Sequence, residues 1–383
     1  MTEWKTYRYT EIADLIGGGT PKTSEPLYWD GDIPWLSVKD FVGDSKYVFS
    51  TEKHITKLGL ENSSTKLLQK DDIIISARGT VGEMAMIPFP MSFNQSCFGI
   101  RAKGSIDPHF LYYYTKTKVN ELKGNSHGSV FDTITRATFD NIICSLPSLE
   151  EQRRIAGILG AIDDKIENNR RINTNLELQA QALFDKIFFG DNDAERNPLS
   201  DYADINPTRT LHQGVVARYI EMANLPTRGS FPSDWSYKSY GGGCKFANGD
   251  TIMARITPCL ENGKTAYIDF LEEQEVAFGS TEYIVISAKS GYCPALFYFL
   301  ARNKEFVDYA VGHMNGSSGR QRVSGVDIAN FSMPHITLEE SNKFAEIAMP
   351  IMDVIMNNTL ENRHLATLRD TLLPKLMNGE IKL

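Results

Sequence analysis

Two stretches of the chain carry the same long hydrophobic pattern. In residues 149–189 apolar side chains recur at alternating steps of four and three, and the pattern returns 189 positions later in residues 338–378. This spacing is typical of helices that pack as a coiled coil. Two asparagines interrupt the apolar seam at matching places in both stretches. They are Asn169, Asn173, Asn358 and Asn362. The shared interruption predicts two long helices packed against each other.

The matching asparagines also bear on the alignment of these helices. In an antiparallel pair, the amides of one helix lie opposite the amides of the other near the centre of the seam. A shifted alignment would set each amide against apolar neighbours and leave its hydrogen-bonding groups without partners, which costs free energy. In such a pair the four asparagines would therefore fix the register.

The segments that precede the two helices resemble each other as well. Each has the mixed strand and helix pattern of an α/β (α+β) globular domain. The stretch Asp72–Arg78 holds an apolar strand that ends near an arginine, and Gly249–Arg255 repeats it. The duplication predicts a pseudo-twofold organisation in four segments. They are a first globular domain (1–148), a central helix (149–189), a second globular domain (190–337) and a C-terminal helix with its tail (338–383).

The turn after the first of these strands has two interpretations. Residues Arg78–Gly82 place a cation and a hydroxyl group on a tight turn flanked by glycines. The turn is either a hairpin with a solvated arginine or an exposed loop that contacts DNA, and its residues leave both open. The two helices keep the same register, whereas the loops of the two domains differ in length and sequence. One scaffold is therefore predicted to display two different surfaces.

Composition and charge narrow the classes of protein. The hydrophobic content of 42% is ordinary for a soluble protein, and no apolar run approaches the ~18 residues that span a membrane. We expect a cytoplasmic protein with no membrane partner. The five cysteines form no CxxC pair, which favours reduced thiols. A net charge of −8 argues against a simple nucleic-acid binder, so a DNA-binding surface must be local or completed by a partner.

The chain lacks the motifs of the common catalytic and metal sites. Its seven histidines form no HxxxH or HxH pair, and no Gly-x-Ser-x-Gly sequence is present. The acidic pairs Asp71-Asp72 and Asp163-Asp164 are expected at a turn and on a solvated helix surface. The sequence therefore predicts no metal site and no catalytic residues, and we expect a protein that binds rather than an enzyme.

Several motifs, taken in order, resemble the specificity (S) subunit of type I restriction-modification systems. Both helices begin with a Pro-x-Leu-Glu-Glu-Gln-like phrase, although the second departs from it by reading Leu-Glu-Glu-Ser. The other motifs that carry the resemblance are Asp72–Gly82, Phe278–Tyr283, Arg320–Ser324 and Leu372–Ile381. Together they cover nearly the whole chain.

The resemblance implies an architecture, a function and a set of partners. It implies two homologous globular target recognition domains separated by two long conserved helices that form an antiparallel coiled coil. Each domain would read one half of an interrupted sequence in double-stranded DNA. Two methyltransferase (M) subunits would bind the helices and methylate adenine with S-adenosylmethionine. Restriction (R) subunits would add ATP- and Mg-dependent translocation and cleavage. This chain would carry no cofactor of its own.

The candidate DNA-contacting residues are hydrogen-bond donors on glycine-rich or strand-end loops, outside the hydrophobic pattern. In the first domain they are Thr20, Arg78, Thr80, Ser126, Ser129 and Arg136. In the second domain they are Arg209, Arg228, Arg255, Thr257, Ser317, Arg320 and Arg322. For each of them, an ordinary turn residue or surface charge is the alternative.

Two other functions fit parts of the pattern. One is a coiled-coil adaptor with two ligand-binding domains that does not bind DNA, and the other is a hydrolase without a recognisable motif. Salt-dependent binding of duplex DNA distinguishes the specificity subunit from the adaptor. Turnover by the isolated chain would favour the hydrolase.

Overall fold

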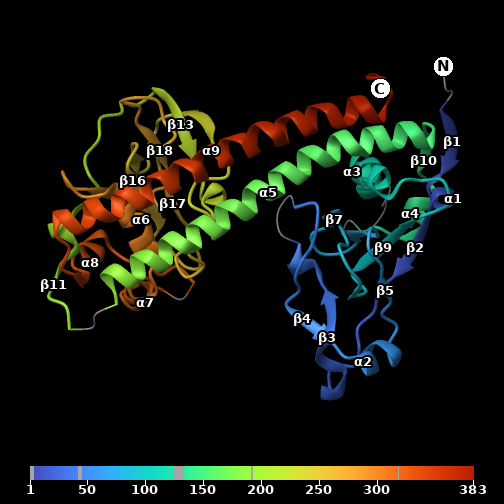
Figure 1. The fold of residues 1–383 in the computed structure, drawn as a ribbon, viewed down its shortest axis with the longest axis horizontal. Helices are drawn as coiled ribbons and strands as arrows, with labels where there is room; N and C mark the ends of the chain where they lie inside the picture. Colours follow the sequence, from blue (N-terminus) through green and yellow to red (C-terminus); the bar gives the residue numbers. More distant parts are fainter. Residues whose placement is uncertain (1–3, 42–44, 125–132, 191–192, 318) are drawn as a thin grey trace. The chain divides into compact units, whose positions relative to one another are not determined.

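The computed structural model describes residues 4–41, 45–124, 133–190, 193–317 and 319–383. The chain forms two compact units (Figure 1). The first unit contains residues 1–167 and 365–383, and the second contains residues 168–364. Each unit combines one domain of mixed strands and helices with parts of two 40-residue helices, α5 (Leu149–Phe188) and α9 (Leu338–Met377). The predicted fold class, two sheet-rich domains with two long helices, is confirmed. The four-segment division remains a prediction, because the compact units share the two helices between them.

The domain of the first unit contains two four-stranded sheets. One is antiparallel, in the order β2 (Ala13–Gly17), β9 (Cys97–Ala102), β6 (Ile73–Ser76) and β7 (Met84–Met86). The other has the order β4 (Lys53–Ile55), β3 (Trp29–Leu36), β8 (Met91–Phe93) and β5 (Leu67–Leu68), with β3 and β8 parallel. The remaining elements are β1 (Lys5–Arg8) paired with β10 (Ile143–Leu146), and the helices α1 (Tyr9–Ile12), α2 (Lys57–Glu61), α3 (Pro108–Gly124) and α4 (Arg136–Asp140).

The domain of the second unit repeats this topology strand by strand. Its antiparallel sheet has the order β12 (Ala203–Ile205), β19 (Tyr283–Ala288), β16 (Asp250–Ala254) and β17 (Thr265–Tyr267). Its other sheet has the order β14 (Ser236–Ser239), β13 (Val216–Ile220), β18 (Ala277–Gly279) and β15 (Lys245–Phe246), again with one parallel pair, β13 and β18. The remaining elements are β11 (Arg196–Pro198) paired with β20 (Ser332–Pro334), and the helices α6 (Pro294–Arg302), α7 (Lys304–Gly312) and α8 (Gly325–Ala329). The internal duplication therefore extends from the helices to the sheets.

Helix α9 begins with a reciprocal cap. The Thr337 hydroxyl accepts a hydrogen bond from the Glu340 backbone N–H (3.2 Å), and the Glu340 carboxylate accepts one from the Thr337 backbone N–H (3.0 Å). Such a capping box satisfies two of the donors that a helix N-terminus leaves free, and its carboxylate also stabilises the helix dipole. The cap explains why the departure at Ser341 does not disturb the helix start.

Within each unit the two long helices pack antiparallel, as predicted. In the first unit, Leu159 of α5 shares one core with Leu373 and Leu376 of α9. In the second unit, the Asn169 side chain donates to the Asn362 side chain (3.0 Å). The four asparagines thus meet as the sequence predicted, because the Asn358 amide also donates to the Asn173 side chain (2.7 Å).

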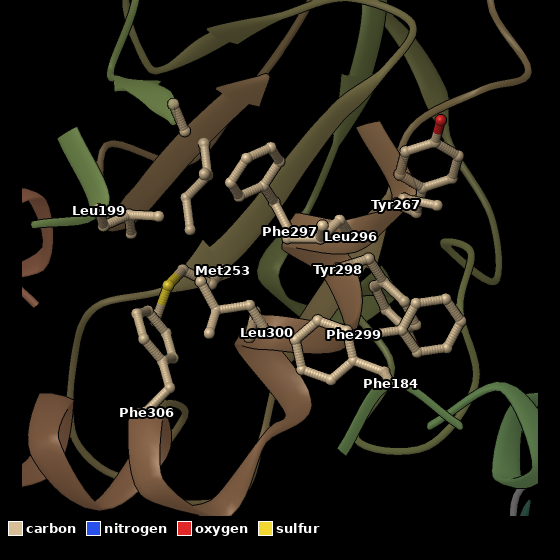
Figure 2. Packing of buried hydrophobic residues seen from close by; sticks show 14 of the residues in the cluster. Phe184, Leu199, Met253, Tyr267, Leu296, Phe297, Tyr298, Phe299, Leu300 and Phe306 are labelled. Atoms are coloured by element: carbon tan, nitrogen blue, oxygen red, sulfur yellow. The ribbon is translucent and has the colours of Figure 1, made fainter. Parts of the chain in front are cut away.

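The second unit buries its aromatic side chains where α5 and α9 meet the domain. Phe184 of α5 contacts Phe299 of α6 and Phe344 of α9, with ring centroids 6.2 and 5.8 Å away. Figure 2 shows Phe184 and Phe299 facing each other in this core. These side chains are fully buried, and burial of one phenylalanine contributes roughly 1.5–3 kcal/mol.

Two acidic residues that the sequence placed in solvent are buried. Asp163 is 6% exposed, and Asp72 is 3% exposed. The Asp163 carboxylate accepts hydrogen bonds from Tyr113 (2.6 Å) and Arg369 (2.8 Å), while Asp72 forms a two-bond pair with Arg101. The prediction was wrong for these two residues. Asp163 is covered by the domain that packs beside the long helices, and Asp72 is paired with an arginine of a neighbouring strand, β9.

None of the helices in the described parts of the chain combines the length and hydrophobicity needed to cross a membrane. The five cysteines are free, and three of them (Cys97, Cys144 and Cys293) are buried. No group of three or more histidine, cysteine, aspartate or glutamate side chains within the described ranges is placed to hold a metal ion.

Candidate nucleic-acid interface

Three segments of the second unit meet at the end of strand β16. The backbone N–H of Arg255 donates to the Glu282 carbonyl (3.0 Å), and the Arg255 carbonyl accepts from the Val323 N–H (3.0 Å). Two residues later, the Thr257 N–H donates to the Gln321 carbonyl (3.1 Å). The turn after β16 is therefore held between the turn that precedes β19 and the loop that follows α7.

The loop after α7 is itself closed by backbone hydrogen bonds. Asn315 and Arg322 exchange two N–H to carbonyl hydrogen bonds of 2.9 Å, and the Arg320 N–H donates to the Ser317 carbonyl (3.0 Å). Because Arg322 also forms a bridge with Ile256, the loop lies beside the turn after β16. Five predicted contact residues from two distant parts of the sequence are brought together here. They are Arg255, Thr257, Ser317, Arg320 and Arg322.

The Arg322 guanidinium has a carboxylate partner. Its Nε lies 3.0 and 2.9 Å from the two Glu282 oxygens, and its Nη2 lies 2.7 Å from Glu282 Oε1. These hydrogen bonds lower the pKa of the Glu282 carboxyl and raise that of Arg322. A planar guanidinium held by two bonds has a fixed orientation, so Glu282 determines how Arg322 is presented.

Two polar atoms of this cluster have no hydrogen-bond partner among the described residues. They are Arg255 Nε and the Thr257 hydroxyl oxygen, and both are buried. Buried polar atoms are nearly always hydrogen-bonded to protein or water. Within the described residues, the free protein therefore leaves one donor and one hydroxyl group unsatisfied beside an exposed arginine-rich loop.

Arg209 occupies a structural position in the same domain. Its Nη2 lies 2.5 Å from Asp250 Oδ1, and the Asp250 side chain is only 1% exposed. Burial raises the pKa of the Asp250 carboxyl, whereas Arg209 acts to lower it. The equivalent pair in the first unit is Asp72 with Arg101. The acid thus keeps its place at the start of the strand, while the arginine comes from a different element in each domain.

The arginines of the two turns are not equivalent, contrary to the sequence prediction. The Ala77 N–H donates to the Ser96 carbonyl (2.7 Å), and the Ala77 carbonyl accepts from the Ile134 N–H (3.1 Å). Arg255 makes these same two kinds of bond, so Ala77 is its counterpart. Arg78 follows one residue later, where its side chain is exposed. The sequence comparison missed this shift because both turns carry an arginine close to a similar apolar strand.

The other candidates in the first unit lie apart from one another in the hydrogen-bond network. The Thr20 hydroxyl donates to the Gln95 side chain, and Arg136 donates to the Leu15 carbonyl (2.8 Å). Thr80 is exposed on the turn after β6, and its carbonyl accepts a hydrogen bond from the Ser76 hydroxyl. Ser126 and Ser129 lie outside the described residues.

Arg228 of the second unit is exposed, and no ion pair of its side chain occurs in the described structure. Lys245 is a residue that the sequence reasoning missed. It lines a small hollow together with Arg209 and Asn206, and its ammonium group donates to the Arg209 carbonyl (2.9 Å). Glu282 was missed too, although it lies within the motif Phe278–Tyr283. The available signal was an acidic residue on the short connection between two strands, β18 and β19.

Comparison with known proteins gives one consistent result. Residues 1–178 match the family model described as the type I restriction modification DNA specificity domain. The chain is 26% identical to the MjaIX specificity subunit of Methanocaldococcus jannaschii over 99% of this chain and 94% of that protein. It is 31% identical to the EcoR124I/EcoR124II specificity subunit of Escherichia coli over 42% of this chain and 41% of that protein.

A solved structure shares the fold. The crystal structure of the type I restriction-modification S subunit from M. genitalium aligns with a TM-score of 0.61 at 15% sequence identity. The alignment covers 98% of this chain and 96% of that one. The similarity therefore includes both domains and both long helices.

Proposed function

Since the chain belongs to the family of type I restriction-modification specificity subunits, we propose that it recognises double-stranded DNA through its two repeated domains. Each domain reads one half of a bipartite target, and the segment between the half-sites is not read. The family membership gives no support to an adaptor that does not bind DNA. The chain is proposed to have a recognition role without catalysis.

One observation carries the proposal for the second domain. Arg255, Thr257, Arg320 and Arg322 lie on two loops that are hydrogen-bonded to each other, although 65 positions separate Arg255 from Arg320. Arginine held by a carboxylate, as Arg322 is held by Glu282, has the geometry that recognises guanine in the major groove. The exposed arginines Arg228 and Arg320 suit phosphate groups, which position a protein on DNA without reading sequence.

The first domain presents a different set of groups on the same scaffold. At the position of Arg255 it has Ala77, and its arginine is displaced onto the exposed turn. The same strands therefore carry unlike side chains toward the DNA. This difference supports two unlike half-sites rather than a palindrome.

The chain is proposed to act with partner subunits. Two M subunits would bind the helices α5 and α9 and methylate adenine with S-adenosylmethionine, and R subunits would add the ATP- and Mg-dependent reactions. The net charge of −8 fits a division in which the partners supply part of the contact with phosphate.

The test uses the chain in complex with its M subunits. Mapping methylated adenine across the genome of a host with and without the gene identifies the target. Binding of a duplex that carries this target is then measured over a range of salt concentrations, with a scrambled duplex as the control. Recognition by this chain requires methylation at one bipartite sequence and weaker binding to the scrambled duplex. Equal, salt-independent binding of both duplexes would contradict the proposal.

A further inference from the structure

A buried ion pair joins the two long helices in the first unit. Arg369 of α9 donates to Asp163 of α5 (2.8 Å), and the Tyr113 hydroxyl of α3 donates to the other carboxylate oxygen (2.6 Å). The side chains of Arg369 and Asp163 are 3% and 5% exposed. The Arg369 Nε also donates to the exposed Asp370 carboxylate (2.9 Å), so the buried Asp163 carboxylate is the charge that depends most on this ion pair.

The duplication supplies a matched layer in the second unit. One contact fixes the correspondence: the Asp107 N–H donates to Gln152 of α5, and the Cys293 N–H donates to Ser341 of α9. Gln152 and Ser341 are 189 positions apart, which is the spacing of the helix repeat. By this spacing the counterparts of Asp163 and Arg369 are Met352 and Ala180, and the counterpart of Tyr113 on α6 is Phe299.

Every polar member of the first layer is apolar in the second. Met352, Ala180 and Phe299 are all buried, and Figure 2 shows Phe299 facing the aromatic ring of Phe184. An apolar set of similar volume often stabilises a fold as well as a buried ion pair does, because the pair must overcome the cost of removing two charges from water. Stability alone therefore does not explain the ion pair, and a role in choosing between partners does.

The alternative partner is a second copy of the same chain. If α5 paired with α5 of another copy in the same geometry, the apolar seam would still match and Asn169 would meet Asn173. Asp163, however, would meet Ala180, and in the corresponding pair of α9 helices Arg369 would meet Met352. Each α5 helix would then bury an Asp163 carboxylate without its ion-pair partner, whereas Arg369 would keep Asp370 of its own helix.

We propose that the Asp163–Arg369 pair makes α5 select α9 over the α5 helix of a second copy. The covalent connection then favours the α9 helix of the same chain, because it raises the effective concentration of that helix. The ion pair thus suppresses self-association of a protein whose two halves carry nearly the same seam.

The first test moves the arginine from one helix to the other. The full-length variant A180R/R369A keeps the net charge of the chain. Its α5 helix then carries both the acid and the arginine, so the ion pair forms only when two α5 helices pack together. The wild-type chain is expected at the mass of one chain, 43.0 kDa, in size-exclusion chromatography with light scattering. The A180R/R369A variant is expected at twice that mass. The control A180R keeps Asp163 paired with Arg369 and is expected to remain at the mass of one chain with a lower melting temperature.

The second test does not depend on the folding of that variant. The full chains D163A and R369A, one of them tagged, are expressed together and separately. When the two chains exchange helices, α5 of the R369A chain and α9 of the D163A chain form the ion pair, and the other two helices form an apolar layer. The two chains are therefore expected to co-purify at a one-to-one ratio. Neither variant is expected to capture an untagged copy of itself. An A180R/R369A chain that is monomeric with the wild-type melting temperature, or D163A and R369A chains that do not associate, would overturn the proposal.

Discussion

The substitution Arg255→Ala separates DNA binding from folding. Arg255 Nε is buried without a hydrogen-bond partner in the part of the chain that the structure describes, so its removal breaks no side-chain hydrogen bond of the free protein. The Arg255 charge acts to lower the pKa of the Glu282 carboxyl, and such a partly exposed attraction contributes about 0–1 kcal/mol. The free energy of unfolding is therefore expected to fall by no more than about 1 kcal/mol. In the cognate complex, an arginine that binds a base edge contributes about 1–3 kcal/mol. The dissociation constant is therefore expected to rise roughly 5- to 150-fold.

Arg209→Ala is the matched control, because it is expected to have the opposite profile. It leaves the buried Asp250 carboxylate without its ion-pair partner, which costs on the order of 3 kcal/mol of folding stability. Urea unfolding and fluorescence anisotropy of a labelled cognate duplex, both on the same preparations, measure the two effects. Wild-type affinity of the Arg255→Ala complex, or a loss of several kcal/mol in its unfolding free energy, would refute the interpretation of Arg255 as a base-contacting residue.

Three further predictions concern the charge, the register and the modularity of the chain. Burial and the Asp353 carboxylate raise the pKa of Asp269 to about 6, above its unfolded value of about 3.9, so stability is lost as pH rises from about 4 through 6. Because Asp269 is only half buried, Asp269→Asn is expected to stabilise the fold by about 1 kcal/mol at pH 7.5 and hardly at pH 4, and equal melting temperatures at pH 7.5 would contradict this. Asn169→Leu removes the donor to Asn362 and to Glu361 and is expected to lower the unfolding free energy by about 1–2 kcal/mol. Adding Asn362→Leu should recover most of that loss in urea unfolding, and a further additive loss would show that the two amides act independently. Replacing residues 1–148 with the matching domain of a relative should change one half-site in the methylation map, and a change in both would exclude modular recognition.

The long helices could be predicted from the sequence because their pattern is local and repeated. A seam of apolar residues with two asparagines in the same places specifies the helical period and the register, and the resemblance to the family supplied the antiparallel direction. Asp163 shows the limit of this reasoning. Its spacing places it beside the seam, and only the packing of Tyr113 from a distant helix shows that it is buried.

The candidate interface was predictable in its members but not in its arrangement. Arginines on strand-end loops were identified from composition, yet their partners lie far away in the sequence, as Glu282 does for Arg322. Ala77, not Arg78, is the structural equivalent of Arg255. The arginine of the first domain is thus shifted by one residue, and its side chain is exposed. Sequence similarity near the turn did not reveal the shift, because strand pairing rather than local composition fixes it.

The buried carboxylate of each sheet also determines where genes of this kind can recombine. The acid comes first in one domain, with Asp72 before Arg101, and second in the other, with Arg209 before Asp250. A crossover between the two arrangements that falls after Asp72 inherits this acid without an arginine from either source, and the resulting domain carries an uncompensated ion in its core. Breakpoints near the ends of the long helices transmit each pair intact. Viable hybrids between the two arrangements should therefore exchange whole domains and have few junctions inside the sheets.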